Sequence, residues 1–216
     1  MERVKRLPAI TPESTGSAEI ADKVRELILT GHFTPGEQVN EVHLASQLNL
    51  SRTPLREALQ RLSQEGLLTG KRNRGLFMIE LTKDDVGEIY RTRELLELTA
   101  AETITSRSAK RRQEVSARLV KIAMLLPEAT AARDWASICR LDLRFHTKLV
   151  AEAGNSRLFR AYTTLAAESL ICMRDLEGSY PTPGAWRDDH LAIAGMIASG
   201  SMDEVRSVLR KHLSAP

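Results

Sequence analysis

The chain has 216 residues, enough for one large domain or two small ones, and its 42% hydrophobic and 27% charged residues are typical of a soluble globular protein. Aromatic residues make up only 4%, which argues against the base-stacking surfaces that bind RNA or single-stranded DNA. No apolar run approaches the roughly 20 residues that a membrane span requires, and the N-terminus lacks the apolar core of a secretory signal. We therefore expect a cytoplasmic protein that does not bind membranes.

The positive charge is concentrated in one short stretch. Residues 51–75 contain six basic and two acidic residues, a local charge of +4, whereas the whole chain carries +3. Such a concentration of charge attracts a polyanion, although charge alone would also fit a membrane surface.

The first part of the chain has the pattern of a small DNA-binding domain. Residues 1–17 are rich in Pro, Ser, Thr and Gly, and we expect a flexible tail. Apolar residues at helical spacing then predict three helices, which lie within residues 18–33, 40–48 and 51–64. Two short apolar runs within residues 66–81 flank a Lys/Arg/Asn/Gly turn, the pattern of a β-hairpin. Three helices followed by a basic hairpin predict a winged helix-turn-helix over residues 18–80.

The third predicted helix begins with Ser-Arg-Thr-Pro, a helix start signal in which Ser51 or Thr53 is the cap. Its leucines share one face, whereas Arg52 and Arg56, four residues apart, share another. Two guanidinium groups at the N-terminal end of such a helix can bind guanine or clamp phosphates in the major groove. A solvated helix face is the alternative, but a helix, a turn and a basic wing in this order favour DNA.

The predicted hairpin supplies further cations. Lys71, Arg72 and Arg74 lie at its tip, where they can reach phosphates or the adjacent minor groove, and Gly75 permits close approach of the backbone.

After residue 82 the strand signals disappear, and amphipathic segments predict a separate all-helical domain over residues 81–216. The expected helices cover roughly residues 83–106, 110–126, 132–152, 156–177, 186–199 and 202–213.

Four polar residues lie on the apolar faces of three of these helices. Asp142 and His146 are four residues apart on one face, and His190 and His212 each lie within an apolar stripe of a later helix. A single such histidine is usually a core residue with satisfied hydrogen bonds, but four buried polar groups each need a partner. One divalent metal ion satisfies all four at once, and the donor set suits Zn, Ni, Mn, Fe or Co.

Arg93 and Glu97 interrupt the apolar stripe of the first helix in this domain. They form either an ordinary surface pair or, for Arg93, an interior cation that awaits an anionic ligand. Arg174, near the end of the predicted helix at residues 156–177, could point into the same interior space as Arg93 and meet the same ligand.

These patterns together resemble the GntR family of bacterial transcriptional regulators, specifically its FadR-type branch with an FCD effector domain. In the first domain the resemblance rests on "PGEQVNEVHLASQLNLSRTPLREALQRLSQEGLL" and on "RG" in the wing. In the second it rests on "YRTRELLELTAA", "DLRFHTKLVAEAGNSRL", "DDHLAIAGMIASG" and "VRSVLRKHL". The fold implied is mainly α, an N-terminal winged helix-turn-helix followed by an all-helical antiparallel bundle.

The resemblance implies a homodimer that binds a pseudo-palindromic DNA operator and responds to a small-molecule effector, usually a carboxylate. Its implied DNA contacts are Ser51, Arg52, Thr53, Arg56, Gly75 and the basic wing residues around Gly75. Its implied metal ligands are Asp142, His146, His190 and His212. We expect one divalent ion per chain, with Zn as the first candidate, and we take Arg93, Asn155 and Arg174 as the candidates for effector binding. One departure is Val42, where some relatives have an arginine that touches DNA, so the base preference is expected to differ.

The function expected is a ligand-responsive repressor without enzymatic activity. A metal-dependent hydrolase and a purely structural metal domain are the alternatives, because three histidines and one aspartate suit both. Hydrolysis needs a positioned base beside an open coordination position, and we assign no residue to that role.

Overall fold

The computed structural model describes residues 16–174 and 185–214, which fall into two compact units, Met1–Leu81 (unit 1) and Thr82–Pro216 (unit 2). The expected flexible tail, apart from its last two residues, lies outside the described residues, as does the expected end of the helix at residues 156–177. None of the described helices combines the length and the apolar character that crossing a bilayer requires.

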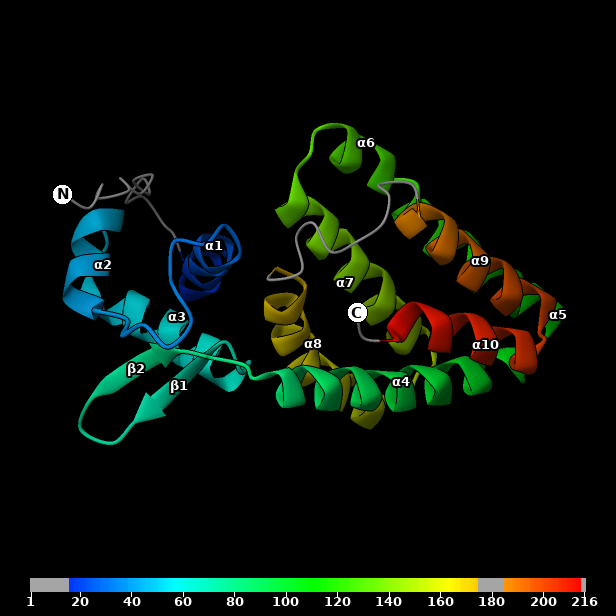
Figure 1. The fold of residues 1–216 in the computed structure, drawn as a ribbon, viewed down its shortest axis with the longest axis horizontal. Coiled ribbons are helices and arrows are strands. Elements are labelled where there is room, and N and C mark those ends of the chain that lie inside the picture. Colours follow the sequence, from blue (N-terminus) through cyan, green and yellow to red (C-terminus); the bar gives the residue numbers. More distant parts are fainter. Residues whose placement is uncertain (1–15, 175–184, 215–216) are drawn as a thin grey trace. The chain divides into compact units, whose positions relative to one another are not determined.

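Unit 1 has the predicted order of helices and strands (Figure 1). Its described elements are α1 (Ser17–Leu29), α2 (Glu41–Leu48), α3 (Arg52–Gln64), β1 (Leu68–Lys71) and β2 (Gly75–Met78). Helix α3 packs against α1, and its leucine face is fully buried, as the spacing predicted. Burial of this face leaves the arginine face of α3 in solvent.

The turn between α2 and α3 depends on one left-handed residue. Asn49 has φ 55° and ψ 44°, a conformation that asparagine tolerates better than most residues. Ser51 is the N-cap of α3, but its side chain makes no capping hydrogen bond there. Pro54 falls in the first turn of α3, where its missing N–H leaves no intrahelical hydrogen bond unmade.

Strands β1 and β2 form the antiparallel wing. The register pairs Leu68 with Met78 and Lys71 with Gly75, so that residues 72–74 form the tip. Asn73 and Gly75 have φ 59° and 85°, which lets the chain reverse between Lys71 and Gly75.

Unit 2 is all-helical over its described residues (Figure 1). Its helices are α4 (Lys83–Thr105), α5 (Ala109–Ala123), α6 (Leu126–Ala131), α7 (Trp135–Glu152), α8 (Ser156–Arg174), α9 (Ala185–Ser199) and α10 (Met202–Leu213). The short α6 was not predicted; α5 ends earlier than expected, and Pro127 lies in the first turn of α6. A mainly α chain with an N-terminal winged helix-turn-helix and a helical C-terminal part is thus confirmed.

Helix α4 packs against α7, α8 and α10, so its inward face reaches the centre of unit 2. A cluster of small and aromatic side chains fills the space between α4, α7 and α8; its members are Ala100, Val150, Ala153, Tyr162 and Ala166. Small residues allow these helices to approach closely, which brings the polar residues of α4 near those of α7.

Candidate functional site

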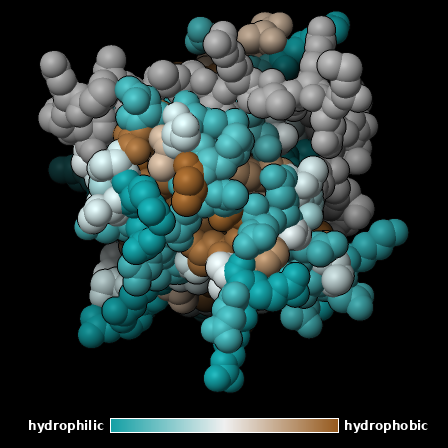
Figure 2. Space-filling model, turned by 90° about the vertical axis from the view of Figure 1, so that its left-hand side faces the viewer, coloured by the Kyte–Doolittle hydropathy of each residue, from teal (hydrophilic) through white to brown (hydrophobic). Residues whose placement is uncertain are grey.

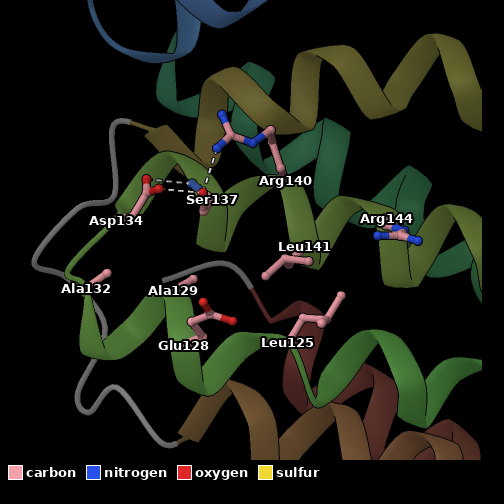
Figure 3. A pocket seen from close by; sticks show the side chains of 9 residues that line it. All are labelled: Leu125, Glu128, Ala129, Ala132, Asp134, Ser137, Arg140, Leu141 and Arg144. Carbon is pink, nitrogen blue, oxygen red and sulfur yellow. Dashed lines mark hydrogen bonds between the residues drawn. The ribbon is translucent and has the colours of Figure 1, made fainter.

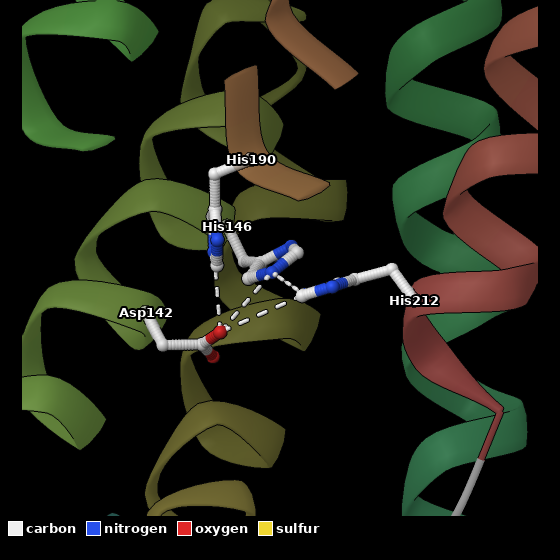
Figure 4. Close-up of side chains that lie close together, drawn as sticks. All are labelled: Asp142, His146, His190 and His212. Carbon is white, nitrogen blue, oxygen red and sulfur yellow. Dashed lines mark hydrogen bonds and ion pairs between the residues drawn. The ribbon is translucent and has the colours of Figure 1, made fainter. Parts of the chain in front are cut away.

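Asp142, His146, His190 and His212 converge inside unit 2 (Figure 4). Asp142 and His146 project from one face of α7, His190 comes from α9 and His212 from α10. One ligand atom from each residue lies within 4.8 Å of those of the other three. Asp142, His146 and His190 are at most 2% exposed. The four residues form a group that could hold a metal ion.

The Oδ1 atom of Asp142 is the centre of this group. His190 Nε2 lies 3.2 Å from it, and the Nε2 atoms of His146 and His212 each lie 3.6 Å from it. The two latter nitrogens are 3.0 Å apart. All three imidazoles thus direct the same ring nitrogen towards one carboxylate oxygen.

The opposite ring nitrogens explain this orientation. His190 Nδ1 lies 2.5 Å from the carbonyl oxygen of Trp186, which can only accept, so Nδ1 donates. His146 Nδ1 donates to Glu97 Oε2 at 2.6 Å, and His212 Nδ1 lies 3.5 Å from Asp189 Oδ2. In a neutral imidazole with a protonated Nδ1, Nε2 carries a lone pair. Partners of this kind hold histidine in the tautomer that binds a metal through Nε2.

The electrostatics of this group would favour a bound cation. Among the described residues, two buried side-chain nitrogens lack a hydrogen-bond partner, His190 Nε2 and Arg93 Nη2. The first faces Asp142 Oδ1, which sets a lone pair against a carboxylate oxygen. Burial without a partner is costly for both atoms, and a divalent ion would relieve that cost for the lone pair of His190 Nε2 but not for the Arg93 donor.

The pKa shifts agree with this arrangement. Burial by itself would raise the pKa of Asp142, but His146, His190 and His212 together outweigh burial and hold the pKa well below its usual range. Burial lowers the pKa of His190 and favours its neutral ring. Burial would also lower the pKa of His212, but Asp142 and Asp189 outweigh it and raise the pKa to about 9. A proton on His212 satisfies only part of the group, whereas a divalent cation would satisfy all four ligand atoms.

Helix α4 contributes a second layer of buried polar residues. Glu97 accepts hydrogen bonds from Arg93 Nε at 3.2 Å and from the Tyr162 hydroxyl at 2.8 Å, in addition to the one from His146. Burial alone would raise the pKa of Glu97, but His146 and Arg93 lower it to about 2, so the carboxyl stays ionised. Arg93 is 1% exposed and Glu97 0%, so their pair lies in the interior and is not the surface pair considered from sequence.

Arg93 also faces the ligand group. Its Nη2 atom lies 3.8 Å from Asp142 Oδ2, too far for a hydrogen bond. Burial by itself would favour the neutral form of Arg93, but Tyr162, Glu97 and Asp142 outweigh burial and raise the pKa of Arg93 well above its usual value. The side chain therefore remains a buried cation.

The other two candidates for effector binding lie at the two ends of α8. Asn155 is exposed, and its side-chain oxygen accepts from the backbone N–H groups of Arg157 and Leu158, so it caps the N-terminus of the helix. Arg174 is half-buried and is the last residue of α8.

Sequence reasoning did not assign Trp186 and Asp189, which lie behind the rings of His190 and His212, or Tyr162, which donates to Glu97 behind His146. Trp186 acts through its backbone oxygen, which no side-chain pattern reveals. Tyr162 lies on a buried face of α8, and a tyrosine there signals a hydroxyl that needs a partner.

A separate cavity of about 500 Å³ lies between α6 and α7 (Figure 3). Its lining residues include Leu125, Glu128, Arg140, Leu141 and Arg144, and none of the predicted site residues. Arg140 donates a hydrogen bond to the Ser137 hydroxyl, and that hydroxyl donates to Asp134, the N-cap residue of α7.

In unit 1 the predicted DNA-contacting residues remain in solvent. Ser51, Arg52, Thr53 and Arg56 are exposed at the N-terminal end of α3, and Lys71, Arg72, Arg74 and Gly75 are exposed on the wing. Figure 2, a view from the side of unit 1, shows hydrophilic side chains that project far outward around smaller apolar areas.

Two of the wing cations lie over one aromatic ring. Lys71 Nζ is 4.4 Å and Arg74 Cζ 5.6 Å from the ring centre of Phe77. Cation–π contacts of this kind restrict where the two charges lie.

Comparison with known proteins places both units. The family described as bacterial regulatory proteins, gntR family, matches residues 17–78, and the FCD domain matches residues 88–215. The Nta operon transcriptional regulator of Aminobacter aminovorans is 31% identical over 182 residues, which cover 84% of this chain and 83% of that protein. The gluconate operon transcriptional repressor of Bacillus licheniformis is 28% identical over 162 residues, 74% of this chain and 65% of that protein.

Among solved structures, E. coli McbR/YncC superimposes with a TM-score of 0.73 at 20% identity, over 93% of this chain and 94% of that one. At this identity the likeness concerns the fold alone.

Proposed function

The chain belongs to the GntR family of bacterial transcriptional regulators and carries an FCD domain, and on this premise we propose that it is a metal-dependent, effector-responsive repressor. In this proposal a homodimer in the cytoplasm binds a pseudo-palindromic operator through α3 and the wing. The named relatives are transcriptional regulators, one of them a repressor, and an enzymatic role is not proposed.

The proposed metal site rests on one observation. Three histidine Nε2 atoms face a single Asp142 oxygen, and one of them, on His190, is buried without a hydrogen-bond partner. Asp142, His146, His190 and His212 would hold one divalent ion, with Zn as the first candidate and Ni, Mn, Fe or Co as the others. When bound, the ion would supply a Lewis-acidic centre that attracts anionic oxygen. Glu97, Asp189 and the Trp186 carbonyl would orient the three rings.

The proposed effector-binding site rests on Arg93. Its Nε donates to Glu97, whereas its Nη2 is buried without a hydrogen-bond partner and lies 3.8 Å from Asp142 Oδ2. A small carboxylate beside the ligand group would satisfy this donor through a charge-assisted hydrogen bond. Arg174 is a second candidate contact. Asn155 is a weaker one, because its oxygen already caps α8.

Regulation would follow from differential affinity. An effector that binds the dimer more tightly in one arrangement of its two DNA-binding domains than in another shifts the population towards that arrangement. The size of the shift is set by the difference between the two affinities. If the favoured arrangement does not match the spacing of the operator half-sites, DNA affinity falls and repression is relieved.

Metal analysis of protein purified without chelator or histidine tag tests the proposal. We expect about one divalent ion per chain, lost in His146→Ala and retained in the control His43→Ala, which removes an exposed histidine of unit 1. Small carboxylates should then raise the melting temperature of the loaded protein but not that of His146→Ala. Wild-type protein that binds no divalent ion when Zn, Ni, Mn, Fe and Co are added would contradict the proposed metal site.

A further inference from the structure

We propose that Glu41 is a positioning residue for DNA readout, which holds the guanidinium group of Arg56 in the orientation that recognises guanine. This inference rests on the proposed function, in which α3 enters the major groove.

Glu41 is itself well anchored. It is the first residue of α2, and the preceding Asn40 caps that helix by accepting from the backbone N–H groups of Val42 and His43. A carboxylate in the first turn is favoured by the helix dipole. The capped helix therefore fixes the backbone that carries the Glu41 carboxylate beside α3.

Arg56 meets this anion with one edge of its guanidinium group. Arg56 Nε donates to Glu41 Oε2 at 3.2 Å. The arginine side chain is nevertheless 64% exposed, and no hydrogen bond within the described chain involves its Nη1 or Nη2 atom. The guanidinium is planar, so fixing Nε also fixes the direction of the terminal Nη1/Nη2 pair. That pair is the fork that can donate to guanine O6 and N7 together.

Without the ion pair to Glu41, the Arg56 side chain could occupy a neighbouring hollow instead. On α3 it borders a hollow of about 490 Å³, whose lining residues are Arg56, Gln60, Ser63, Gln64 and Leu76. Gln60 and Gln64 follow Arg56 at intervals of four residues, so their amide oxygens lie along the same helix face. A long side chain beside such a hollow populates several rotamers, and ordering it on DNA costs conformational entropy. The ion pair with Glu41 selects one of these positions before DNA arrives.

A carboxylate on a DNA-facing surface also repels phosphate. Repulsion alone predicts that neutralising Glu41 strengthens binding to every duplex, because phosphate contacts carry no sequence information. Positioning predicts a different pattern, in which binding to random sequence stays equal or strengthens while recognition of one guanine weakens. The two effects have opposite signs and can therefore be separated.

The test uses the full-length protein and a duplex that the wild type selects from a random pool. Each guanine in turn is replaced by 7-deazaguanine, which lacks the N7 acceptor, and affinity is measured by fluorescence anisotropy. The guanine read by Arg56 is the one whose replacement weakens the wild type, on the order of 10-fold, but not Arg56→Ala.

We call the loss of affinity on replacing that guanine by 7-deazaguanine the 7-deazaguanine penalty. Glu41→Gln should show little of this penalty, while it binds random duplex at least as tightly as the wild type does. Glu57→Gln is the matched control, since it removes the same charge from the exposed residue next to Arg56 and should keep the full penalty. Glu41→Asp separates charge from reach: it should bind random duplex like the wild type yet lose part of the penalty. Circular dichroism checks that each variant is folded.

If the wild type selects no duplex, the proposed function fails. If it selects one, and Arg56→Ala loses the penalty while Glu41→Gln and Glu41→Asp keep it, the proposed function stands and the role of Glu41 is overturned.

Discussion

Glu97 joins helices α4, α7 and α8 through one buried carboxylate, so Glu97→Gln perturbs the polar network of unit 2 where these three helices meet. The glutamine keeps the shape and one acceptor oxygen. It removes the negative charge beside the buried Arg93. Its NH₂ group is a donor and would face other donors, either His146 Nδ1–H at the Oε2 position or Arg93 Nε and the Tyr162 hydroxyl at the Oε1 position. Breaking a buried charge pair from one side costs about 3–5 kcal/mol. We expect the free energy of unfolding of unit 2 to fall by about this amount.

Urea unfolding followed by tryptophan fluorescence measures this loss directly. The chain has two tryptophans, Trp135 and Trp186, and both lie in unit 2 with ring centres 5.7 Å apart. A chelator keeps the protein metal-free during the measurement. Glu94→Gln is the control, because Glu94 lies on the same helix and pairs with Arg210 at 2.8 Å with both side chains partly in solvent. An exposed pair of this kind contributes at most about 1 kcal/mol.

The same variant also tests how His146 is oriented. Loss of a carboxylate partner behind a metal-binding histidine typically lowers metal affinity by about 10–100-fold, which competition with a chelator would detect. The reasoning is refuted if Glu97→Gln is no less stable than Glu94→Gln and binds metal as tightly as the wild type.

Three further predictions concern protons and salt. Because the pKa of His212 is raised to about 9, its ring is charged near pH 7.5 in metal-free protein and must lose its proton to bind a metal. Calorimetric titration with ZnCl₂ in buffers of different ionisation enthalpy should therefore show about one proton released per ion near pH 7.5, declining above about pH 9; release that does not change with pH would contradict this. Burial alone would raise the pKa of Glu152, but Lys148 and Arg118 lower it, so its stabilisation is present above its unfolded pKa and is lost as the pH falls through the folded one. Glu152→Gln should accordingly be less stable than the wild type by about 2 kcal/mol at pH 7, and urea midpoints should show the gap closing in acid; an equal gap at both pH values would argue against the charge. At the wing tip, Arg72→Ala should lower the slope of log affinity against log salt by about 1 without changing base preference, as anisotropy titrations at several salt concentrations can show. An unchanged slope would remove Arg72 from the phosphate contacts.

Much of the fold of unit 1 follows from local patterns. The leucines of α3 recur at helical spacing and are fully buried, and the residues around the wing turn favour the left-handed backbone that Asn73 and Gly75 adopt. These signals act over a few residues, so sequence reasoning can detect them.

The short helix α6 shows where such reasoning falls short. A helix of six residues carries too little periodicity to stand out, and Pro127 is compatible with a loop or with a first helical turn. Packing against α7 stabilises it as a helix, and that contact is not a local property of the sequence.

The metal-ligand candidates illustrate the same division. The sequence by itself determined that Asp142, His146, His190 and His212 carry polar groups on apolar helix faces, because the period of a helix is built into the backbone. Only the tertiary structure decided that three Nε2 atoms face one carboxylate oxygen, that Glu97, Asp189 and a Trp186 carbonyl lie behind the rings, and that Asn155 caps a helix. The physical reason is that a helix face tells which side chains point inward, whereas the partner each one meets depends on how α4, α7, α9 and α10 pack against one another.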